Sequence, residues 1–550
     1  MGATLPPAHR CFNMRNPFAR VVLLSVTLLF LVFMMLRSDA IDVRAAIIKT
    51  AKAAKAAGSQ SPLHGHGSDV SENGELRGSS HTNSSRPHVM SCDYDMDHLR
   101  GLHDKFALGQ QFEYTKRYVK ISRQDIKRKS VTKLQQAFMP DQVKLIDVNN
   151  ESAKQTCPEP LAVPVTRSPF PSTARASDFI FGVSTTYKRF TDPKTSSINE
   201  WTYWLTDGKG KSNGGKMLLL LLGASPEELE DAYNRLAAVG IDVDVYQSDP
   251  GMEMAVRYLT LVPTLYNHPD RKGRKWIVTC DDDTFFPSFN ALAERFEEYD
   301  HEMPMYIGTL SEDVNNIERH GAQAFGGAGV FLSMPLAKLI SEKYEGCKTE
   351  DKVKESNTGW GPQGDILLRK CIYENSEVKL TVLNDLWQLD LFNDPSGFYE
   401  SGIKPLSLHH YRGGGWHIAY PWHTTKVAHL CGEDCTMQRF RTKDNFVISN
   451  GFSVAFYPKG IDFDMNQMER TFTAAPRDKG WNLDFRLGPQ RRTLHKTGRK
   501  ISWDLQESTV NDDGSVTQLY VRRHNDWRWK TASGQAMSDV DGVIELVWIS

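Results

Sequence analysis

The stretch between residues 179 and 280 alternates largely apolar runs with amphipathic segments, and this alternation restricts the fold more than any other feature of the 550-residue chain. The apolar runs are FIFGV at 179–183, MLLLLL at 217–222 and KWIVTC at 275–280. Runs without a polar alternation are typical of strands buried on both faces, as in parallel sheets that helices cover on either side.

Two helices are predicted between these strands. The first begins at Ser225, which forms a capping box with Glu228, and it ends at Gly240. Its predicted apolar face consists of Leu229, Ala232, Tyr233, Leu236 and Ala237. A strand at 241–245 and a second helix at 253–266 follow. Strands and helices therefore alternate, which predicts an α/β domain with a mainly parallel central sheet.

Three consecutive carboxylates, Asp281, Asp282 and Asp283, directly follow the last of these strands. The carboxyl end of a buried strand is where α/β sheets place their ligand sites. In an extended chain Asp281 and Asp283 project to one side and Asp282 to the other. Asp281 and Asp283 together therefore form an oxygen-rich site for Mn²⁺ or Mg²⁺. Such a metal holds a diphosphate and neutralises its charge as it leaves. The alternative is a loop of solvated aspartates.

Asp365 is the candidate general base. It lies in GPQGDILL, before an apolar segment, where a carboxylate could take a proton from a hydroxyl group. The same position also suits a helix N-cap, which is the alternative. Gly326 and Gly327, in FGGAGVF, allow a tight turn and a close approach of backbone to a ligand, or a plain bend in a strand.

His409 and His410 follow another apolar run, LSL, and are candidate metal ligands because they accompany a predicted metal site. Packed histidines are the alternative. The indoles of Trp360, Trp387 and Trp416 are interpreted as core residues, and stacking on a sugar or a base is the alternative.

The N-terminal region predicts a membrane anchor. Residues 21–36 are apolar and uncharged, and three arginines precede them, so the basic flank is expected in the cytosol and the rest of the chain in the lumen. A cleaved signal peptide is the alternative, although no small-x-small cleavage site follows. Glycosylation acceptors at Asn83 and Asn150 agree with a lumenal location. We expect a single-pass type II protein of the Golgi membrane, or of the endoplasmic reticulum.

Charge and cysteine content agree with a lumenal enzyme. The 66 Lys and Arg residues nearly balance the 67 Asp and Glu residues, so nothing indicates a nucleic-acid partner. Seven of the eight cysteines follow the apolar run, and an odd number cannot all pair within one chain. Cys280 is the candidate free thiol, whereas Cys347 with Cys371, and Cys431 with Cys435, are candidate disulfides.

These features divide the chain into five parts: a cytosolic tail at 1–20, an anchor at 21–36, a stem and unassigned region at 37–177, the α/β domain at 178–442 and a small, mostly β accessory module at 443–550. The last part is inferred from short β-like runs at 446–448, 452–457, 518–522 and 543–548.

Five segments, taken in order, resemble the Fringe-like branch of the β1,3-glycosyltransferases (glycosyltransferase family 31), and are most similar to its fungal and plant members. They are FIFGVSTT, RYLTLVPTLY with RKWIVTCDDDTFF, GGAGVFLS, GDILLRKC and SLHH. The resemblance extends over residues 178–411. It implies a GT-A-type fold, a Mn²⁺-dependent UDP-sugar site and an inverting mechanism.

The resemblance also implies roles for single residues. Asp281 and Asp283 would bind the metal, with Asp283 as the most direct ligand, and His409 would complete the metal site, with His410 as the fallback. Asp365 would be the base. The donor nucleotide would lie near Thr185, Asp281, Asp282, Gly326 and Gly327. Two positions depart from the family pattern, because Gly364 replaces an acidic residue before the base and Arg369 replaces a glycine.

The predicted function is transfer of a sugar from a UDP-sugar to a hydroxyl of a glycan or glycoprotein in the Golgi lumen. A non-catalytic scaffold that binds a sugar or glycoprotein is the alternative, motivated by Gly364 and Arg369. A metal-dependent phosphohydrolase is a third reading, which lacks a visible phosphate loop. The expected partners are the donor, the acceptor and the membrane, and a homodimer is left open.

Overall fold

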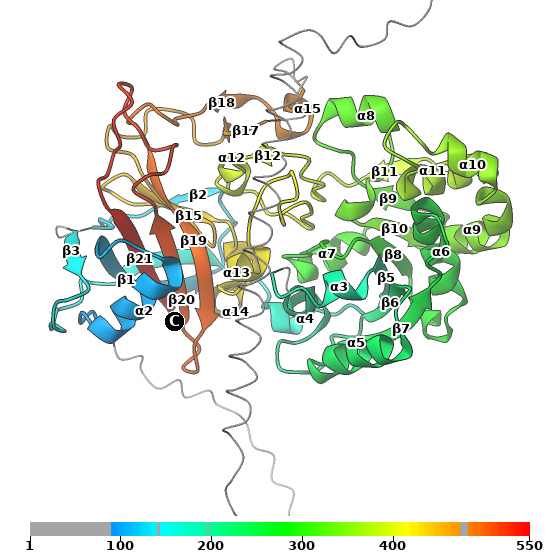
Figure 1. The fold of residues 1–550 in the computed structure, drawn as a ribbon, viewed down its shortest axis with the longest axis horizontal. Coiled ribbons are helices and arrows are strands. Elements are labelled where there is room, and N and C mark those ends of the chain that lie inside the picture. Colours follow the sequence, from blue (N-terminus) through cyan, green and yellow to red (C-terminus); the bar gives the residue numbers. More distant parts are fainter. Residues whose placement is uncertain (1–89, 140–142, 195–196, 474–481) are drawn as a thin grey trace, which may run out of the picture. The chain divides into compact units, whose positions relative to one another are not determined.

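The computed structural model describes residues 90–139, 143–194, 197–473 and 482–550, and it contains two large sheets (Figure 1). The described residues all belong to one compact unit, Ser84–Ser550. The predicted anchor at 21–36 lies outside them. Within the described ranges, no helix has both the length and the apolar character needed to span a membrane.

The first sheet has seven strands in the order β11-β9-β10-β8-β5-β6-β7. Their bounds are Phe179–Thr185 (β5), Lys216–Leu222 (β6), Asp242–Ser248 (β7), Trp276–Cys280 (β8), Tyr306–Gly308 (β9), Val330–Ser333 (β10) and Leu380–Val382 (β11). Strands β5 to β8 are parallel, whereas β10 is antiparallel to both β8 and β9. The predicted α/β domain is confirmed, with a mixed sheet that is mainly parallel.

Helices cover both faces of this sheet. Ile180, Leu218 and Ile277 pack with α6 (Met254–Asn267), α9 (Met334–Cys347) and α11 (Gly364–Asn375). Phe179, Phe181 and Met217 point to the other face, with α4 (Ser197–Leu205), α5 (Pro226–Ala238) and α7 (Phe289–Phe296). Neighbouring residues of one strand thus pack into the cores on opposite faces of the sheet, which explains the unbroken apolar runs.

The predicted capping box at the start of α5 is present, since Ser225 and Glu228 each bond the other's backbone. The predicted apolar face is too wide, however. Ala232 and Leu236 are buried, whereas Tyr233 is 48% exposed and Ala237 is also exposed. This helix covers the sheet near β7, so only a narrow stripe of it meets the core.

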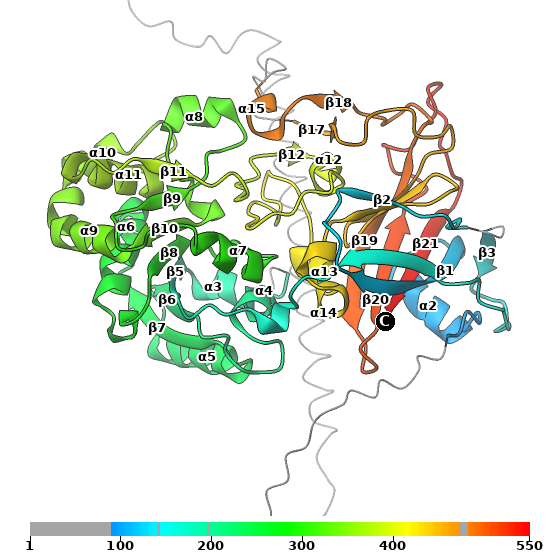
Figure 2. The same ribbon diagram turned by 180° about the vertical axis from the view of Figure 1, so that it is seen from behind.

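The second sheet has ten strands, in the order β2-β13-β14-β15-β19-β20-β21-β1-β3, with β4 also paired to β1 (Figure 2). Their bounds are Gln111–Gln124 (β1), Val131–Lys133 (β2), Lys144–Asp147 (β3), Leu161–Thr166 (β4), Arg439–Arg441 (β13), Phe446–Ser449 (β14), Ser453–Phe456 (β15), Ile501–Val510 (β19), Val516–Arg522 (β20) and Asp541–Ile549 (β21).

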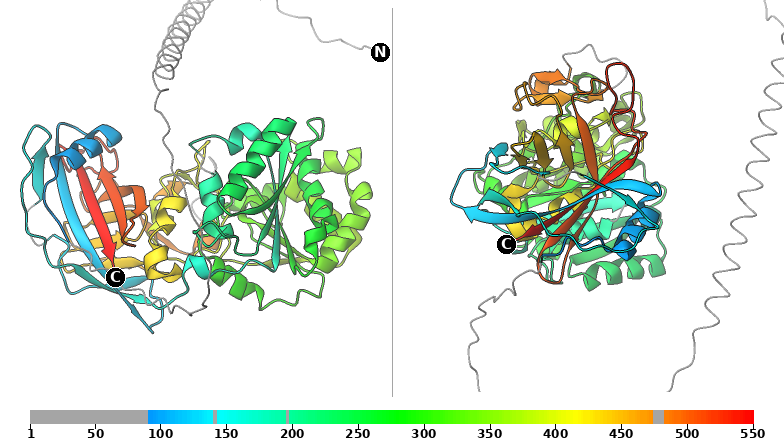
Figure 3. Two further views of the ribbon diagram at one scale, coloured as in Figure 1. Left: turned by 90° about the horizontal axis from the view of Figure 1, so that it is seen from below. Right: turned by 90° about the vertical axis from the view of Figure 1, so that its left-hand side faces the viewer.

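This sheet corrects the predicted boundaries. The stretch 90–177, taken from the sequence as stem or unassigned, contributes β1 to β4, and β1 runs parallel to β21 from Phe112↔Asp541 to Lys120↔Ile549. The β module is therefore neither small nor confined to 443–550. Figure 3 shows β1 and β21, in blue and red, side by side. The seven-stranded sheet is inserted into the chain between β4 and β13.

The remaining elements are short. The α-helices are Met96–Phe106 (α2), Tyr187–Phe190 (α3), Val314–His320 (α8), Glu350–Glu355 (α10), Ser396–Tyr399 (α12), Pro421–Thr425 (α13), Ala428–Cys431 (α14) and Asp484–Leu487 (α15). The strands are Phe392–Asn393 (β12), Met468–Arg470 (β16), Phe472–Thr473 (β17) and Gln490–Arg492 (β18). The 3₁₀ turns are Pro171–Thr173 (η1), Pro269–Arg271 (η2), Gly326–Ala328 (η3) and Glu433–Cys435 (η4).

Both predicted disulfides are confirmed: Cys347 pairs with Cys371, which joins α9 to α11, and Cys431 pairs with Cys435. A third disulfide joins Cys92 to Cys157. Cys280 is the free cysteine of the described part of the chain, and it is buried at the end of β8 as predicted.

Buried ionic contacts connect the ten-stranded sheet to the segment after α12 and to β16. The fully buried Lys500, just before β19, places its ammonium 2.5 Å from Glu400, which follows α12, and 3.1 Å from Glu469. Ser453 of β15 also donates a hydrogen bond to Glu400, at 2.6 Å. Removing one partner of such a cluster leaves a buried charge uncompensated, so these contacts fix the junction.

Candidate active site

The predicted site residues converge at one edge of the seven-stranded sheet. Asp281 follows β8, whose carboxyl end lies beside that of β5. The antiparallel β10 begins at the same edge, because Val330 pairs with Thr279. A short bridge between Phe285 and Leu408 then brings the next residue, His409, back to this edge. Segments far apart in the sequence thus meet where β8 ends.

Asp281, Asp283 and His409 form a group able to hold a metal ion, with one ligand atom of each within 4.8 Å of the others. His409 Nε2 lies 3.1 Å from Asp283 Oδ1 and 3.4 Å from Asp281 Oδ2. Two carboxylates with one imidazole suit Mn²⁺, because Mg²⁺ is bound mainly by oxygen ligands and waters. The donor set therefore fits the predicted metal.

The charges of this group attract a cation. Burial lowers the pKa of His409, but the charge of Asp283 and hydrogen bonds to both carboxylates outweigh burial and raise that pKa to about 10. Burial raises the pKa of Asp283, yet the charge of His409 and its hydrogen bond hold it well below the usual range. Two carboxylates that draw a proton onto a buried histidine provide the potential that a divalent cation requires.

Asp282 projects to the other side, as the alternation predicts, and is buried. Arg189 donates to its carboxylate from Nε at 2.7 Å and from Nη2 at 2.5 Å, and Thr185 Oγ1 donates to it as well. Arg412 lies 3.8 Å away and also binds the buried Glu200. Thr185 thus contacts the triplet. Arg189, Arg412 and Glu200 were not predicted from the sequence. The one available signal was the position of Arg412, directly after the two candidate histidines and Tyr411.

The glycine turn η3 supports His409. A Cβ on Gly327 would lie 2.0 Å from His409 Cε1, so only glycine leaves room for the ring. Thr284 Oγ1 donates to the Gly327 carbonyl at 2.8 Å, which ties the turn to the aspartate loop. A Cβ on Gly326 would lie 2.8 Å from the Tyr258 hydroxyl. The close approach that these glycines permit in the structure is to protein side chains.

Asp365 is the second residue of α11, whose N-cap is Gln363, so the N-cap alternative for Asp365 is wrong. Its carboxylate accepts hydrogen bonds from the backbone N–H of Ile366 at 2.8 Å and of Gly326 at 3.4 Å. Burial raises its pKa to about 6, against the effect of these hydrogen bonds. Asp365 therefore contacts the same turn that supports His409.

The two departures from the family pattern have packing reasons. A Cβ on Gly364 would lie 2.3 Å from Cβ of Tyr258 in α6, so an acidic side chain has no space there. The Arg369 guanidinium packs on Gly321, where a Cβ would lie 1.8 Å from its Nη1. Both positions tighten the packing around α11 rather than remove a carboxylate from the metal group.

His410 lies outside the metal group. It pairs with Asp390 at 2.9 Å, and its ring stacks on that of Trp416, with centroids 4.0 Å apart, and packs at a tilt against that of His409, with centroids 3.9 Å apart. Trp387 is buried, as predicted for a core residue, but Trp360 is 75% exposed, which contradicts the core interpretation.

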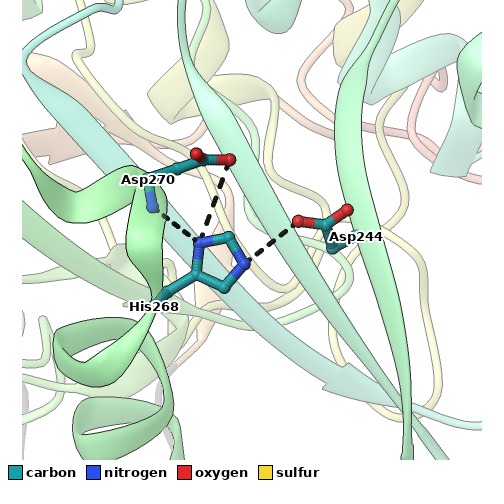
Figure 4. Close-up of side chains that lie close together, drawn as sticks. All are labelled: Asp244, His268 and Asp270. Carbon is teal, nitrogen blue, oxygen red and sulfur yellow. Dashed lines mark hydrogen bonds and ion pairs between the residues drawn. The ribbon is translucent and has the colours of Figure 1, made fainter.

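A second group of possible ligands, Asp244, His268 and Asp270, lies at the opposite edge of the sheet (Figure 4). His268 Nε2 is 3.0 Å from Asp244, and Nδ1 is 4.0 Å from Asp270. The ammonium of Lys216, at the start of β6, lies 3.0 Å from Asp244 and 3.3 Å from Asp270. Because a lysine already neutralises these carboxylates, we interpret the group as an ion-pair cluster.

A family model described as Fringe-like matches residues 244–395. This part of the chain is Fringe-like. The Fringe-like segment spans less than a third of the sequence and includes Asp281, Asp283 and Asp365. Thr185 and His409 lie outside it, and the fold brings both of them to the aspartate triplet.

Three solved structures illustrate the similarity to known proteins. Mouse xyloside xylosyltransferase 1 is 12% identical, over 37% of this chain and 85% of that one, with a TM-score of 0.24. The Pyrobaculum calidifontis mannosyltransferase solved with GDP-Man and Mn²⁺ is 13% identical, over 40% of this chain and 60% of that one, with a TM-score of 0.23. Core-mannan synthase A from Aspergillus fumigatus is 8% identical, over 50% of this chain and 93% of that one, with a TM-score of 0.24.

The match thus spans less than two thirds of the Pyrobaculum chain. Because all three TM-scores are below 0.5, these likenesses carry no weight for the function of this chain. No curated protein matches the sequence.

Proposed function

We propose that the protein is an inverting, metal-dependent glycosyltransferase that moves a sugar from a UDP-sugar to a hydroxyl of a glycan or glycoprotein. One observation carries the proposal: Asp281, Asp283 and His409 form a metal-competent group, and Asp365 is hydrogen-bonded to the turn that supports it. Asp281, Asp283 and Asp365 lie within the Fringe-like segment.

Asp281, Asp283 and His409 would hold Mn²⁺. Once bound, that ion would neutralise the charge of the departing diphosphate. The protein places its ligands in advance. Gly327 leaves space for the His409 ring, and the Phe285–Leu408 bridge fixes the backbone on which that ring stands. Arg189 holds Asp282 on the far side, which keeps the two flanking carboxylates facing His409.

Asp365 would take the proton from the acceptor hydroxyl. A general base acts best when its pKa lies near the working pH, and burial brings the pKa of Asp365 to about 6. The amides of Ile366 and Gly326 orient its carboxylate. For inversion, the acceptor hydroxyl must attack from the face opposite the leaving diphosphate, so a base separate from the metal ligands is required.

A screen of UDP-sugars tests the proposal. UDP release by the purified full chain should occur with one donor in Mn²⁺ and stop in EDTA. Asp283→Asn should abolish release, whereas Asp512→Asn, at an exposed aspartate of the β19–β20 turn, should have no effect. Unchanged release in Asp283→Asn would refute the metal assignment.

A non-catalytic sugar-binding scaffold is the second candidate, motivated by Gly364. It requires Mn²⁺-dependent UDP binding without turnover of any donor, and no effect of Asp365→Asn. The contact of Gly364 with Tyr258 supplies a packing reason for this glycine that does not involve loss of activity.

We also propose that the enzyme works in the Golgi lumen, anchored by residues 21–36. Three disulfides in the described part of the chain favour an oxidising compartment. A C-terminal epitope tag should survive protease treatment of intact membrane vesicles and be digested after detergent is added. Digestion in intact vesicles would overturn the predicted orientation.

A further inference from the structure

A cavity of about 730 Å³ lies between the ten-stranded sheet and the segment that follows the seven-stranded sheet in the chain. One wall comes from the inserted domain, through residues 393–395 next to β12 and residues 416–424 around the start of α13. The other wall comes from the ten-stranded sheet, through the β14–β15 turn, β19 and the segment 523–528 after β20. Figures 1 and 2 show α13 beside β19. Neither domain forms this cavity alone.

The wall of the cavity is linked to the candidate active site by a row of packed rings. Trp416 lines it and stacks on His410, with ring centroids 4.0 Å apart and planes 10° apart. His410 in turn packs at a tilt of 32° against His409, the imidazole of the metal group, with ring centroids 3.9 Å apart. Trp416, which forms part of the cavity wall, is therefore the third ring in a row that begins at His409 of the metal group.

Exposed apolar side chains gather on both walls. Ile418 and Tyr420 on one side are 61% and 46% exposed, and Trp527 on the other side is 52% exposed. Lys496 lies 4.9 Å above the Trp527 ring and the His495 ring meets it at 5.3 Å, so the indole is held in place. Exposed aromatic groups that other side chains hold in position are typical of binding surfaces.

The polar groups of the cavity are suited to a neutral ligand. Asp394, Asp504 and Asp526 all lie on the wall, but Arg528 binds each of them, with Asp526 at 2.7 Å and Asp394 at 3.4 Å. These three carboxylates outnumber the two arginines of the wall, Arg528 and Arg523, which disfavours an anion such as a nucleotide phosphate. The amide side chains of Asn393, Gln506 and Asn525 remain as uncharged hydrogen-bonding groups.

We propose that this cavity binds the acceptor as a neutral oligosaccharide. A pyranose ring has a face of C–H groups that packs on an indole or phenol, and a rim of hydroxyls that bonds to amides and carboxylates. A site with aromatic walls and a few polar groups matches both features. The inference rests on the proposed transferase function and names the acceptor class.

The test uses the purified full chain and four neutral tetrasaccharides: maltotetraose, cellotetraose, mannotetraose and chitotetraose. Binding is measured by saturation-transfer NMR, and Mn²⁺-dependent UDP binding is measured on the same samples. At least one tetrasaccharide should bind. Trp527→Ala and Tyr420→Ala should each weaken that binding tenfold or more, while Trp527→Phe should retain most of it. Tyr233→Ala is the matched control, because Tyr233 has similar exposure on α5.

Three results would overturn the proposal: no tetrasaccharide binds at millimolar concentration, the bound one is unaffected by either cavity variant, or tetragalacturonate binds as well as the neutral probes. Displacement of the bound sugar by an unglycosylated peptide would assign the cavity to a peptide and also overturn it. UDP binding should be unchanged in all cavity variants. If wild-type protein bound the sugar through Trp527 but no UDP, the cavity proposal would stand and the transferase proposal would fail.

Discussion

Replacing Gly327 with alanine should dismantle the metal group without altering any ligand. The new Cβ would lie 2.0, 2.2 and 2.3 Å from Cε1, Nδ1 and Nε2 of His409. The backbone of Gly327 does not have a positive φ, so alanine can adopt its conformation without strain. The substitution therefore acts through steric contact with the His409 ring.

The size of the effect follows from the space around that ring. Ordinary contact begins near 3.4 Å, so the ring has to retreat by about 1.4 Å. The His410 ring already packs against it, with centroids 3.9 Å apart, which restricts the retreat. A metal–nitrogen bond of about 2.1 Å does not tolerate such a shift. We expect Mn²⁺ affinity to fall by roughly 10- to 100-fold, the range seen when the groups that orient a ligand are changed.

Calorimetric titration of Mn²⁺ into the purified protein, in the presence of UDP, measures this loss. Gly346→Ala is the control, because a Cβ at that helical glycine meets no atom within 4 Å. Overpacking also costs about 1–3 kcal/mol of stability, so thermal unfolding must show that Gly327→Ala is folded at the assay temperature. Wild-type Mn²⁺ affinity in the folded variant would refute the assignment of His409 as a ligand.

Three further predictions concern the base, the lysine cluster and a disulfide. Asp365→Asn should lower turnover by roughly 10²- to 10⁴-fold with unchanged UDP and Mn²⁺ affinity. Because the base must be ionised, the wild-type rate should fall as the pH drops through about 6. A wild-type rate that stays constant from pH 5 to 8 would exclude Asp365 as the base. Lys216→Met leaves three half-exposed carboxylates without their lysine and should lower the free energy of unfolding in urea by about 2 kcal/mol. The variant should still bind one Mn²⁺ per chain. A wild-type stoichiometry of two would contradict our interpretation of Asp244, His268 and Asp270 as an ion-pair cluster. Replacing Cys347 and Cys371 together with alanine opens a loop with a sequence separation of 24 and should cost about 3 kcal/mol, whereas an unchanged melting temperature would show that α9 and α11 need no covalent link.

The seven-stranded sheet was predictable because its information is local. The runs FIFGV, MLLLLL and KWIVTC are each apolar on both faces, and each forms a strand at the predicted place. Strand β1 also alternates buried and exposed residues over part of its length. Its partner β21, however, lies more than 400 residues away, and no local pattern identifies a partner at that separation. Strands β1 to β4 were missed for this reason, whereas the β-like runs predicted at 446–448, 452–457, 518–522 and 543–548 coincide with β14, β15, β20 and β21.

The candidate site also has a part that local sequence patterns predict and a part that depends on remote contacts. The alternation of the aspartates separates Asp282 from its two neighbours, and the structure shows that separation. The position of His409 depends on the Phe285–Leu408 bridge, which joins residues more than 120 apart. The residues alone left both His409 and His410 as candidate ligands, and only the family resemblance favoured His409. Glu200 and Arg189 were missed because a buried or paired charge has no distinct sequence pattern when its partner is remote.

The insertion of one domain into the sheet of the other limits how the protein can be divided. A fragment that began at residue 178, the boundary predicted from the sequence, would lack β1 and expose the edge of β21, a strand buried along its whole length. It would also lack Arg128, whose guanidinium donates to the carbonyls of Gly402 at 2.7 Å and Ile403 at 3.1 Å, in the segment that leads to His409. An exposed apolar strand edge promotes aggregation. The described residues between 90 and 177 therefore belong to the same folded unit, because they contribute β1 to β4 to the sheet whose strands β4 and β13 flank the inserted segment.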